Sequence, residues 1–374
     1  MRPQIAIITY DRRAHIGAHH TDDLLLREAL RRMGADATIV SWKNPNVDPT
    51  AFDAVVLRSC WDSYRNPAAF LDWLASVDKD RPRLVNRRDV LEWNFHKAHY
   101  LSDLTAAFPP DANRPDANRP DANPSGQIVP SLFLSKHEQV VASEGPFHSA
   151  IGKTFGEMVA ELDEQVGTAW RGRDIVVKPA ISASGENTFC FCRTADENLA
   201  YGEDILPIDK APEIVQQLLG NEASPGIIVQ PLLAGIKNGE YSLVYIDGKV
   251  SFAIHKVTNA GDFQHRAEAN RLGIHAADLP PHMRDFADQL ISYVTDKFGP
   301  EAITYARVDI VQESAELPIL LELELVEPSL QFVRIPEMYY GNTLAPSLSE
   351  IQQGDAAMTA ALEQFAKAIL GRIA

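Results

Sequence analysis

The chain has 374 residues, of which 45% are hydrophobic and 23% charged, as in an ordinary soluble globular protein of two or three domains. Its formal charge of −16 argues against nucleic acid or an anionic membrane as the main partner. Three cysteines (Cys60, Cys190 and Cys192) make neither a disulfide framework nor a zinc site. No apolar run reaches transmembrane length and no signal-peptide pattern is present, so we expect a cytoplasmic protein.

The first 95 residues alternate short buried strands with amphipathic helices. This β-α-β-β-α-β order predicts a parallel sheet with helices on its faces. Ligands of such sheets bind beyond the carboxyl ends of the strands. We therefore take Arg58, Trp61 and Asp62 as candidate substrate contacts, although a surface loop anchored by one tryptophan is an equally good interpretation. The expected strands are 4–10, 37–41, 54–58 and 84–86, and the expected helices are 22–33 and 68–77.

A helix is expected over residues 89–104, and Lys97 lies on it. Beyond this helix, DANRPDANRPDANP at 111–124 repeats a pentapeptide that is rich in proline and turn-forming residues. Each residue before a proline is kept out of the helical region of backbone space, so this insert is expected to be extended. We assign it no function.

The middle of the chain predicts a small antiparallel sheet. One of its strands ends in Lys178 and is followed by ISASGEN, residues 181–187, which we name the Ser/Gly loop. Small residues let backbone N–H groups approach a phosphate closely, and a lysine at the strand end strengthens that interpretation. The expected strands are 131–134, 174–179, 189–193 and 227–231, and a helix is expected over 152–166.

The last third begins with a hairpin whose turn is Asp247-Gly248, a dipeptide typical of tight hairpins. Glu240 and Lys256 lie on its two strands. Asp262, in the polar loop that follows, is another candidate substrate contact. The expected strands are 240–246 and 249–256, and the expected helices are 281–298 and 356–373.

A second hairpin, between residues 305 and 331, carries the strongest functional signal. Strand side chains alternate between faces, so Arg307 shares a face with Asp309, and Glu322 shares one with Glu324. Carboxylates in a leucine-rich strand are costly to bury unless a cation meets them. With Glu327 they form an oxygen-rich set suited to Mg²⁺, beside an arginine that can hold a phosphate or an oxyanion. A half-solvated hairpin with a charged outer face is the alternative.

These pieces together suit a nucleoside triphosphate bound with Mg²⁺. Cations and loop amides would hold the phosphates, carboxylates would hold the metal, and an arginine would stabilise charge during transfer. The sequence contains no Walker A motif and no kinase glycine-rich loop with its partner motifs.

The same pieces, in the same order, resemble the ATP-grasp superfamily of D-alanine–D-alanine ligases and glutathione synthetases. The resemblance covers most of the chain outside the insert and implies an α/β (α+β) fold in three parts. These are an N-terminal parallel α/β domain over 1–95, a segment over 96–232 with the helix, the insert and a small antiparallel lid, and a C-terminal α+β domain over 233–374 with the metal site. ATP would lie between the last two, and a homodimer is possible by analogy.

The resemblance also implies individual roles. Arg307 and Lys256 are the expected catalytic residues, and Asp309 is the expected first metal ligand. Glu322, Glu324 and Glu327 fall where the family has a Glu-x-Asn metal pair. Because ELELVEP contains no asparagine, which of these glutamates bind metal stays open. The residues expected to bind ATP are Lys97, Lys178, Ser182, Ser184, Gly185, Gln230 (where the family often has glutamate), Leu232, Leu233 and Glu240.

A narrower likeness is carried by LRSCWD, WNFHK, VVKPAISASG, GEYSLVYIDGKVSFAIHK with GDFQ, and RVD with LELELVEPSL. These motifs resemble the O-ureidoserine cyclo-ligases of D-cycloserine biosynthesis and their relatives. The likeness implies an ATP- and Mg²⁺-dependent ligase of secondary metabolism that activates a small amino-acid-like substrate by phosphoryl transfer before an amine attacks. The alternatives are a carboxylate–amine ligase of the dipeptide type, a degenerate nucleotide-binding scaffold without catalysis, and a small-molecule kinase.

Overall fold

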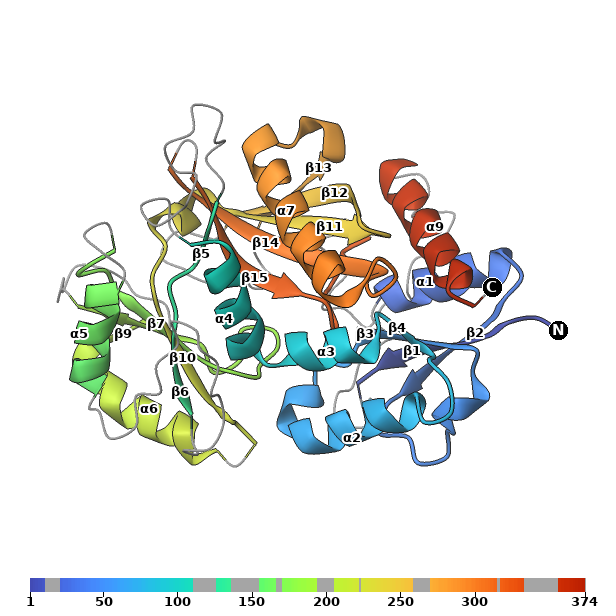
Figure 1. Cartoon of the computed structure of the whole chain (residues 1–374), viewed down its shortest axis with the longest axis horizontal. Helices are drawn as coiled ribbons and strands as arrows, with labels where there is room; N and C mark the ends of the chain where they lie inside the picture. Colours follow the sequence, from blue (N-terminus) through green and yellow to red (C-terminus); the bar gives the residue numbers. More distant parts are fainter. Residues whose placement is uncertain are drawn as a thin grey trace.

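The computed structural model describes residues 1–10, 21–109, 126–135, 155–165, 170–193, 205–221, 223–257, 270–314, 317–332 and 356–373. Within them, a four-stranded, a six-stranded and a five-stranded sheet follow one another along the molecule (Figure 1). Asp262 and the insert at 111–124 lie outside the described residues. Among the described helices, none has the length and apolar character needed to cross a membrane.

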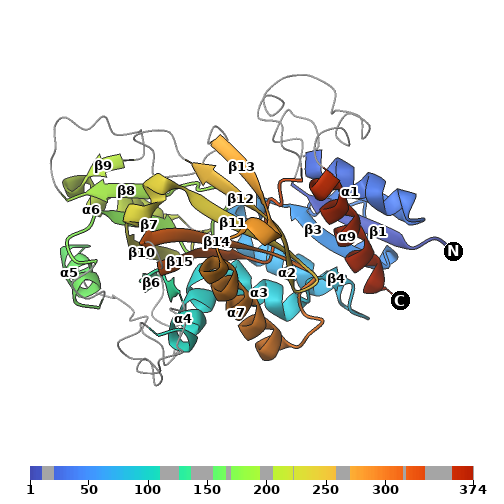
Figure 2. The same ribbon diagram turned by 90° about the horizontal axis from the view of Figure 1, so that it is seen from above.

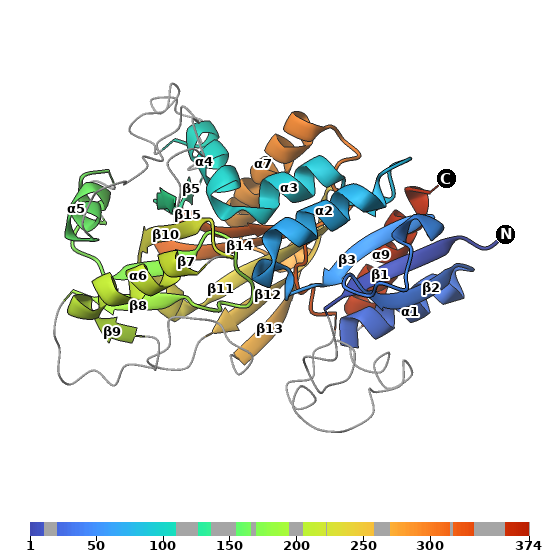
Figure 3. The ribbon, with the colours of Figure 1, turned by 90° about the horizontal axis from the view of Figure 1, so that it is seen from below.

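The four-stranded sheet is wholly parallel, as the sequence predicted. Its order is β2 (Asp36–Ser41), β1 (Gln4–Thr9), β3 (Ala54–Ser59) and β4 (Leu84–Val85). Helices α1 (Thr21–Arg32) and α9 (Ala356–Gly371) cover one face (Figure 2), and α2 (Pro67–Val77) and α3 (Arg88–Phe95) cover the other (Figure 3). Because both faces are covered, β1 and β3 are mostly apolar, and all their residues except Gln4 are buried.

The five-stranded sheet forms one wall of the cleft described below. Its order is β6 (Leu132–Ser135), β10 (Gly226–Pro231), β7 (Ile175–Pro179), β8 (Phe189–Cys192) and β9 (Ile205–Pro207). The first four strands are antiparallel, as predicted, whereas β9 adds a parallel edge that the sequence did not reveal. Helices α5 (Phe155–Gln165) and α6 (Ala211–Gly220) pack on one face, so the alternating residues Lys178 and Gln230 face the other way.

The six-stranded sheet forms the opposite wall. Its order is β13 (Asn270–His275), β12 (Lys249–Val257), β11 (Glu240–Ile246), β14 (Tyr305–Ser314), β15 (Leu317–Glu324) and β5 (Gln127–Ile128). Helices α7 (Pro281–Phe298) and α4 (Lys97–Ala107) pack against it. The hairpin turn between β11 and β12 has positive φ at Asp247 (51°) and Gly248 (73°), as its sequence predicted. The 3-10 helices are η2 (Pro49–Ala51), η3 (Ser63–Arg65), η5 (Ile208–Lys210), η6 (Ala234–Asn238) and η7 (Ala276–Asp278).

The helix predicted over residues 89–104 is in fact two helices, α3 and α4, so that prediction is wrong at its centre. His96 is extended at the break, with φ −101° and ψ 109°. The backbone N–H of Lys97 donates to the carbonyl oxygen of Ala180 at 2.9 Å, just beyond β7. This tertiary hydrogen bond satisfies an N–H that the first turn of a helix leaves without an intrahelical partner. The break thereby fixes Lys97 beside the Ser/Gly loop.

Candidate active site

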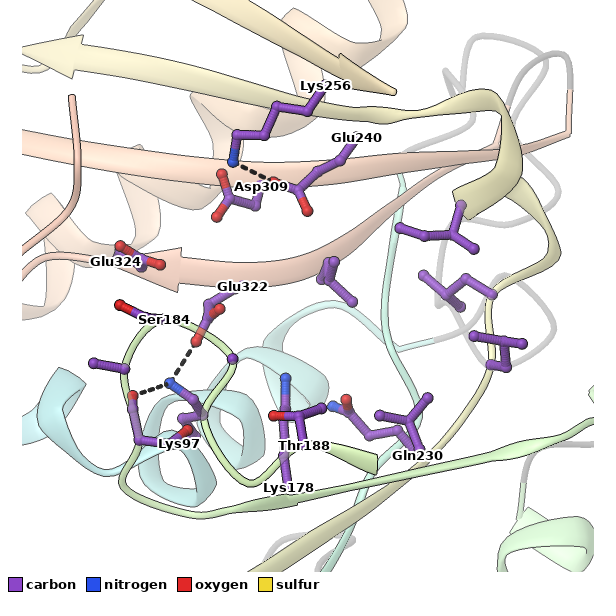
Figure 4. Close-up of a pocket in the computed structure, with 18 of the residues that line it drawn as sticks. Lys97, Lys178, Ser184, Thr188, Gln230, Glu240, Lys256, Asp309, Glu322 and Glu324 are labelled. Carbon is purple, nitrogen blue, oxygen red and sulfur yellow. Dashed lines mark hydrogen bonds and ion pairs between the residues drawn. The ribbon is translucent and has the colours of Figure 1, made fainter. Parts of the chain in front are cut away.

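A cavity of about 230 Å³ lies between the five-stranded and the six-stranded sheets (Figure 4). It gathers side chains that are up to 227 residues apart in sequence, from Lys97 to Glu324. The predicted residues that line it are Lys97, Lys178, Ser182, Ser184, Gly185, Gln230, Leu232, Leu233, Glu240, Lys256, Arg307, Asp309, Glu322 and Glu324. The lining residues that were not predicted are Val176, Ala183, Thr188, Pro231, Ile236 and Leu321.

The unpredicted lining residues carry no charge, and most are apolar, so they gave no chemical signal of their own. Strand alternation could have found Val176, because it lies two residues before Lys178 and must share its face. Ile236 could not have been found in that way, since it belongs to the 3-10 helix η6.

Three carboxylates meet on the floor of the cavity. Across β14 and β15, Asp309 is the register partner of Glu322, and Arg307 is that of Glu324. One carboxylate oxygen from each of Asp309, Glu322 and Glu324 lies within 4.8 Å of the other two. Mg²⁺ takes hard oxygen ligands from a few carboxylates and shares the rest of its shell with phosphate and water. The donor set therefore fits Mg²⁺.

Arg307 is buried among these carboxylates, with 7% of its surface exposed. Its Nη2 donates to Asp309 Oδ2 at 2.8 Å and to Glu324 Oε1 at 2.6 Å. Its Nη1 donates to the carbonyl oxygen of Ser329 at 3.0 Å. A guanidinium held by two carboxylates and a carbonyl keeps one orientation, which is what recognition of a planar, charged group requires.

Burial and neighbouring charges move the carboxyl pKa values in opposite directions. Burial raises the pKa of Asp309, but the charges of Arg307 and Lys256 and the hydrogen bonds from Arg307 and Ser242 together outweigh it, and the value falls to about 2. Burial also raises the pKa of Glu322, but the charges of Lys97 and Lys178 and the contact with Lys97 together lower it. The pKa of Glu324 rises to about 7 because burial outweighs Arg307. A divalent cation among the three would stabilise all of them in the charged form.

Three lysines enter the cavity from three different elements. Lys97 Nζ, in the first turn of α4, lies 2.5 Å from Glu322 Oε1, and Lys256 Nζ on β12 lies 2.7 Å from Glu240 Oε1. Lys178 Nζ, at the end of β7, has no hydrogen-bond acceptor in the described part of the chain, and burial lowers its pKa. The charges of Glu322 and Glu240 oppose that shift, but a buried ammonium group that lacks hydrogen-bond acceptors is still costly. Lys178 is therefore placed to receive an anionic group.

The Ser/Gly loop curves around Lys97, across the cavity from Lys256 (Figure 4). Ser184 (φ 55°), Gly185 (φ 67°) and Asn187 (φ 58°) have left-handed backbone conformations. Its base is held by Lys97, whose Nζ donates to the carbonyl oxygen of Ser182 at 3.2 Å. Turns of this kind direct successive backbone N–H groups into a concave anion site. The loop geometry is thus compatible with phosphate.

The strand β10 leads from the cavity wall into the apolar end of the cavity. Gln230 is buried, and its Nε2 donates to Ser131 Oγ at 2.7 Å. Leu232, Leu233 and Ile236 then supply apolar surface. Flat apolar walls beside backbone polar groups are typical of pockets that take a planar ring.

Glu327 lies apart from the other carboxylates. It neither lines the cavity nor belongs to the three-carboxylate set. Burial and then the charge of Glu324 raise its pKa to about 8, and its Oε2 atom is buried without a hydrogen-bond partner among the described residues. Its carbonyl oxygen accepts a 3.1 Å hydrogen bond from Trp61 Nε1, and the Trp61 ring stacks on Tyr10. Glu327 therefore lies between the cavity and the carboxyl end of β3.

The other predicted substrate contacts are held within the protein. Asp62 accepts hydrogen bonds from Trp42 Nε1 at 2.8 Å and from Lys43 Nζ at 2.7 Å. The Arg58 guanidinium carbon lies 5.6 Å from the ring centroids of Tyr305 and Phe365, on the α9 side of the sheet. Asp262 lies outside the described residues. The structure thus places Trp61 in hydrogen-bond contact with the segment that carries Glu327. Asp62 acts on Glu327 only through its charge, and Arg58 packs against Tyr305 and Phe365.

The overall architecture can now be compared with known proteins. The crystal structure of D-alanine–D-alanine ligase from Bacillus anthracis matches with a TM-score of 0.56 at 11% identity, over 99% of this chain and 98% of the ligase. At this identity the likeness concerns the fold. The chain has the ATP-grasp fold, so the expected fold class is confirmed.

A more specific likeness is to DcsG. The crystal structure of D-cycloserine synthetase DcsG matches with a TM-score of 0.67 at 22% identity, over 99% of this chain and all of DcsG. The cycloserine biosynthesis protein DcsG of Streptomyces lavendulae is 26% identical over 315 residues, 82% of this chain and 86% of that protein. Residues 5–86 match the family described as the N-terminal domain of D-cycloserine synthetase DcsG. The expected resemblance is confirmed: the chain is similar to DcsG over most of its length, and it has the ATP-grasp fold.

Proposed function

We propose that this protein is an ATP- and Mg²⁺-dependent ligase that activates a small amino-acid-like substrate by phosphoryl transfer and then forms a C–N bond. One observation carries the proposal. Arg307 and three lysines face the three-carboxylate set within one cavity between two sheets. A site that only bound a nucleotide would not need an arginine held rigidly against the metal-ligand candidates.

The cavity offers a place for each part of ATP. Leu232 and Leu233, which follow β10, would flank the base, and Glu240 is the candidate for the ribose. Lys97, Lys178 and the Ser/Gly loop would hold the phosphates. Asp309, Glu322 and Glu324 would hold Mg²⁺, which neutralises phosphate charge when bound. We call this cavity the nucleotide half of the cleft.

The acceptor half is the region of residues 58–65, at the carboxyl end of β3, together with residues 325–327, which lie beside it. A hydrogen bond from Trp61 to Glu327 joins these two segments. In open α/β sheets ligands bind beyond the carboxyl ends of the strands, which favours this place for the amino-acid-like substrate. Glu327 of the acceptor half is near enough to Glu324 of the nucleotide half for their charges to interact, which supports a cleft in which substrate and phosphate meet.

The chain's own residues position and neutralise the reactants. A substrate carbonyl oxygen attacks the terminal phosphorus, ADP leaves, and Arg307 stabilises the charge that spreads over the transferred group. The amine nitrogen then attacks the activated carbon, loses a proton, and displaces phosphate. No protein nucleophile is needed, because the protein contributes orientation and charge.

In the narrower form of the proposal the attacking nitrogen belongs to the same molecule, and the product is a ring. The likeness to DcsG, a cycloserine biosynthesis protein, favours an O-ureidoserine-like substrate. The fold likeness to D-alanine–D-alanine ligase favours instead a carboxylate and a separate amine. A need for ATP places the reaction in the cytoplasm, and a homodimer stays a prediction.

The test is ADP release from Mg·ATP with a panel of acceptors: O-ureido-D-serine, O-ureido-L-serine, single amino acids and amino acid pairs. We expect release with one O-ureidoserine isomer alone and a cyclic product by mass spectrometry. Release only with a pair would move the protein to the carboxylate–amine ligases. A phosphorylated product that accumulates without a ligated one would indicate a kinase, and ATP binding without release on any acceptor would contradict the proposal.

A further inference from the structure

The Ser/Gly loop belongs by connectivity to the five-stranded sheet, because it joins β7 to β8, yet it is anchored on the N-terminal sheet. Ile181, its first residue, is 8% exposed and lies in the hydrophobic cluster that α2 forms with β3, alongside Phe70 and Leu57. A loop whose base is buried in a neighbouring part of the molecule cannot move freely with its own sheet.

The tip of the loop has a second anchor on the same side. Residues 184–187 are exposed, and the Glu186 carboxylate there accepts a hydrogen bond from the Tyr64 hydroxyl. Arg65 Nη2 lies 4.0 Å from the same carboxylate, and Arg65 Nε donates to the Tyr64 hydroxyl oxygen at 3.2 Å. Burial and the Glu186 contact raise the pKa of Tyr64, which keeps the phenol protonated as a donor.

Tyr64 and Arg65 form the end of η3, which begins two residues after Trp61. They therefore extend directly from the acceptor half of the cleft, while Glu186 is adjacent to Gly185 in the lining of the nucleotide half. Among the described residues, the contacts of Glu186 with Tyr64 and Arg65 are the side-chain hydrogen bond and ion pair that connect the exposed loop tip to another element.

We propose that Tyr64 and Arg65 are positioning residues that hold Glu186, and through it the Ser/Gly loop, against the acceptor half. The contact sets the distance between the phosphate-binding amides and the bound acceptor. Ligation depends on that distance, because a small displacement of either reactant is costly in rate. The inference rests on the proposed function, in that the loop is taken to contact phosphate.

The first test is free of substrate. Hydrogen exchange of the amides of 183–188 is measured by mass spectrometry in Tyr64→Phe, Glu186→Gln and the double variant. In each single variant these amides are expected to exchange about two- to fivefold faster, which corresponds to the free energy of an exposed side-chain pair. In the double variant they should exchange no faster than in the single variants, because both changes remove the same contact. Arg81→Gln, which removes an exposed ion pair to Asp53 (3.1 Å) in the N-terminal region, should leave the loop unchanged. Unchanged or additive exchange would overturn the proposal.

The second test uses turnover. With an acceptor found by ADP release, the same three variants should lower kcat by one shared factor of about two to five. The dissociation constant for ATP, measured by calorimetry without acceptor, should change less, because Lys97 and Lys178 are untouched. Weakened ATP binding with kcat retained would overturn the positioning role. If the wild type released no ADP with any acceptor, the proposed function would fail, while the exchange measurement would still decide whether the contact holds the loop.

Discussion

The nucleotide half and the acceptor half of the cleft hold their charged groups in different ways. In the nucleotide half, Lys97, Lys256 and Arg307 each contact a carboxylate that also faces the cavity. In the acceptor half, Asp62 is bonded to Trp42 and Lys43 within the N-terminal sheet region. The nucleotide half thus presents its charged groups to a charged ligand, whereas in the acceptor half Asp62 is already bonded to side chains of the protein.

The difference follows from the elements that carry the residues. The charged groups of the nucleotide half lie on paired strands, whose register fixes the spacing of their side chains. The acceptor half is built from the loop after β3 and the segment after β15. Loops tolerate sequence changes while the strands that support them keep their structure. The preference for an acceptor can therefore change while the nucleotide site stays the same. The four predictions below test this division, from the largest expected effect to the smallest.

Replacing Arg307 by alanine should abolish most turnover. Loss of a transfer arginine lowers kcat by about 10³-fold or more. The change also leaves Asp309 and Glu324 without their cation, so the midpoint of thermal unfolding should fall and should recover in part when Mg²⁺ is added. Steady-state ADP release and thermal unfolding measure the two effects separately.

Arg83→Ala is the matched control for that variant. Arg83 is as little exposed as Arg307 and donates to Asp80 and to the carbonyl oxygen of Phe52, but it does not line the cavity. It should lower stability while kcat of the folded enzyme stays within about twofold. Equal kcat losses in both variants would show that Arg307 acts through folding alone.

The metal set can be separated from Glu327 by magnesium titration. Asp309→Asn and Glu322→Gln should raise the Mg²⁺ concentration for half-maximal ADP release by at least about tenfold, since even groups that only orient ligands have such effects. Glu327→Gln should leave it within about twofold, because Glu327 lies outside the set. If the Mg²⁺ concentration for half-maximal ADP release rose equally in all three variants, Glu327 would be a metal ligand and would belong to the nucleotide half.

The same contrast explains what could be predicted from the sequence. Strand alternation alone put Arg307 on one face with Asp309 and Glu322 on one face with Glu324, and the structure pairs them across β14 and β15. The parallel N-terminal sheet likewise followed from the order of its elements. Regular structure converts sequence spacing into spatial spacing, so both results were accessible.

Features that depend on contacts between distant parts of the chain could not be predicted from the sequence. The break at His96 depends on a hydrogen bond from Lys97 to Ala180, 83 residues away. The environment of Asp62 depends on Trp42 and Lys43, which lie on another strand end. Buried polar groups need hydrogen-bond partners, but a local sequence pattern does not show which distant donor will bond to a given carboxylate.

Glu327 should make stability fall with rising pH when no ligand is bound. Its pKa rises from an ordinary 4.5 to about 8, so between these values the unfolded chain loses a proton that the folded protein keeps. Stability is therefore fully present below pH 4.5 and is lost as pH rises toward 8. Glu327→Gln lacks this loss and should be more stable than wild type by about 1–3 kcal/mol at pH 8, after allowance for partial exposure.

Urea unfolding at pH 5 and pH 8, without Mg²⁺ or ATP, measures this difference. Glu363→Gln, at an exposed position of α9, is the control and should shift stability at neither pH. A Glu327→Gln variant that gains nothing at pH 8 would mean that the Glu327 carboxylate is already stabilised in the free protein, as that of Asp309 is.

The smallest expected effect concerns the hydrogen bond from Trp61 to the carbonyl oxygen of Glu327. Trp61→Phe keeps an aromatic ring beside Tyr10 but removes the Nε1 hydrogen bond to the carbonyl oxygen of Glu327. One neutral hydrogen bond contributes about 1 kcal/mol, so KM for the acceptor should rise about two- to fivefold while KM for ATP stays constant. Trp93→Phe is the matched control, because it removes an indole hydrogen bond of 2.8 Å, to Asp103, away from the cleft. If Trp61→Phe raised KM for ATP instead, the segment after β15 would serve the nucleotide half, and the acceptor would have to be sought elsewhere.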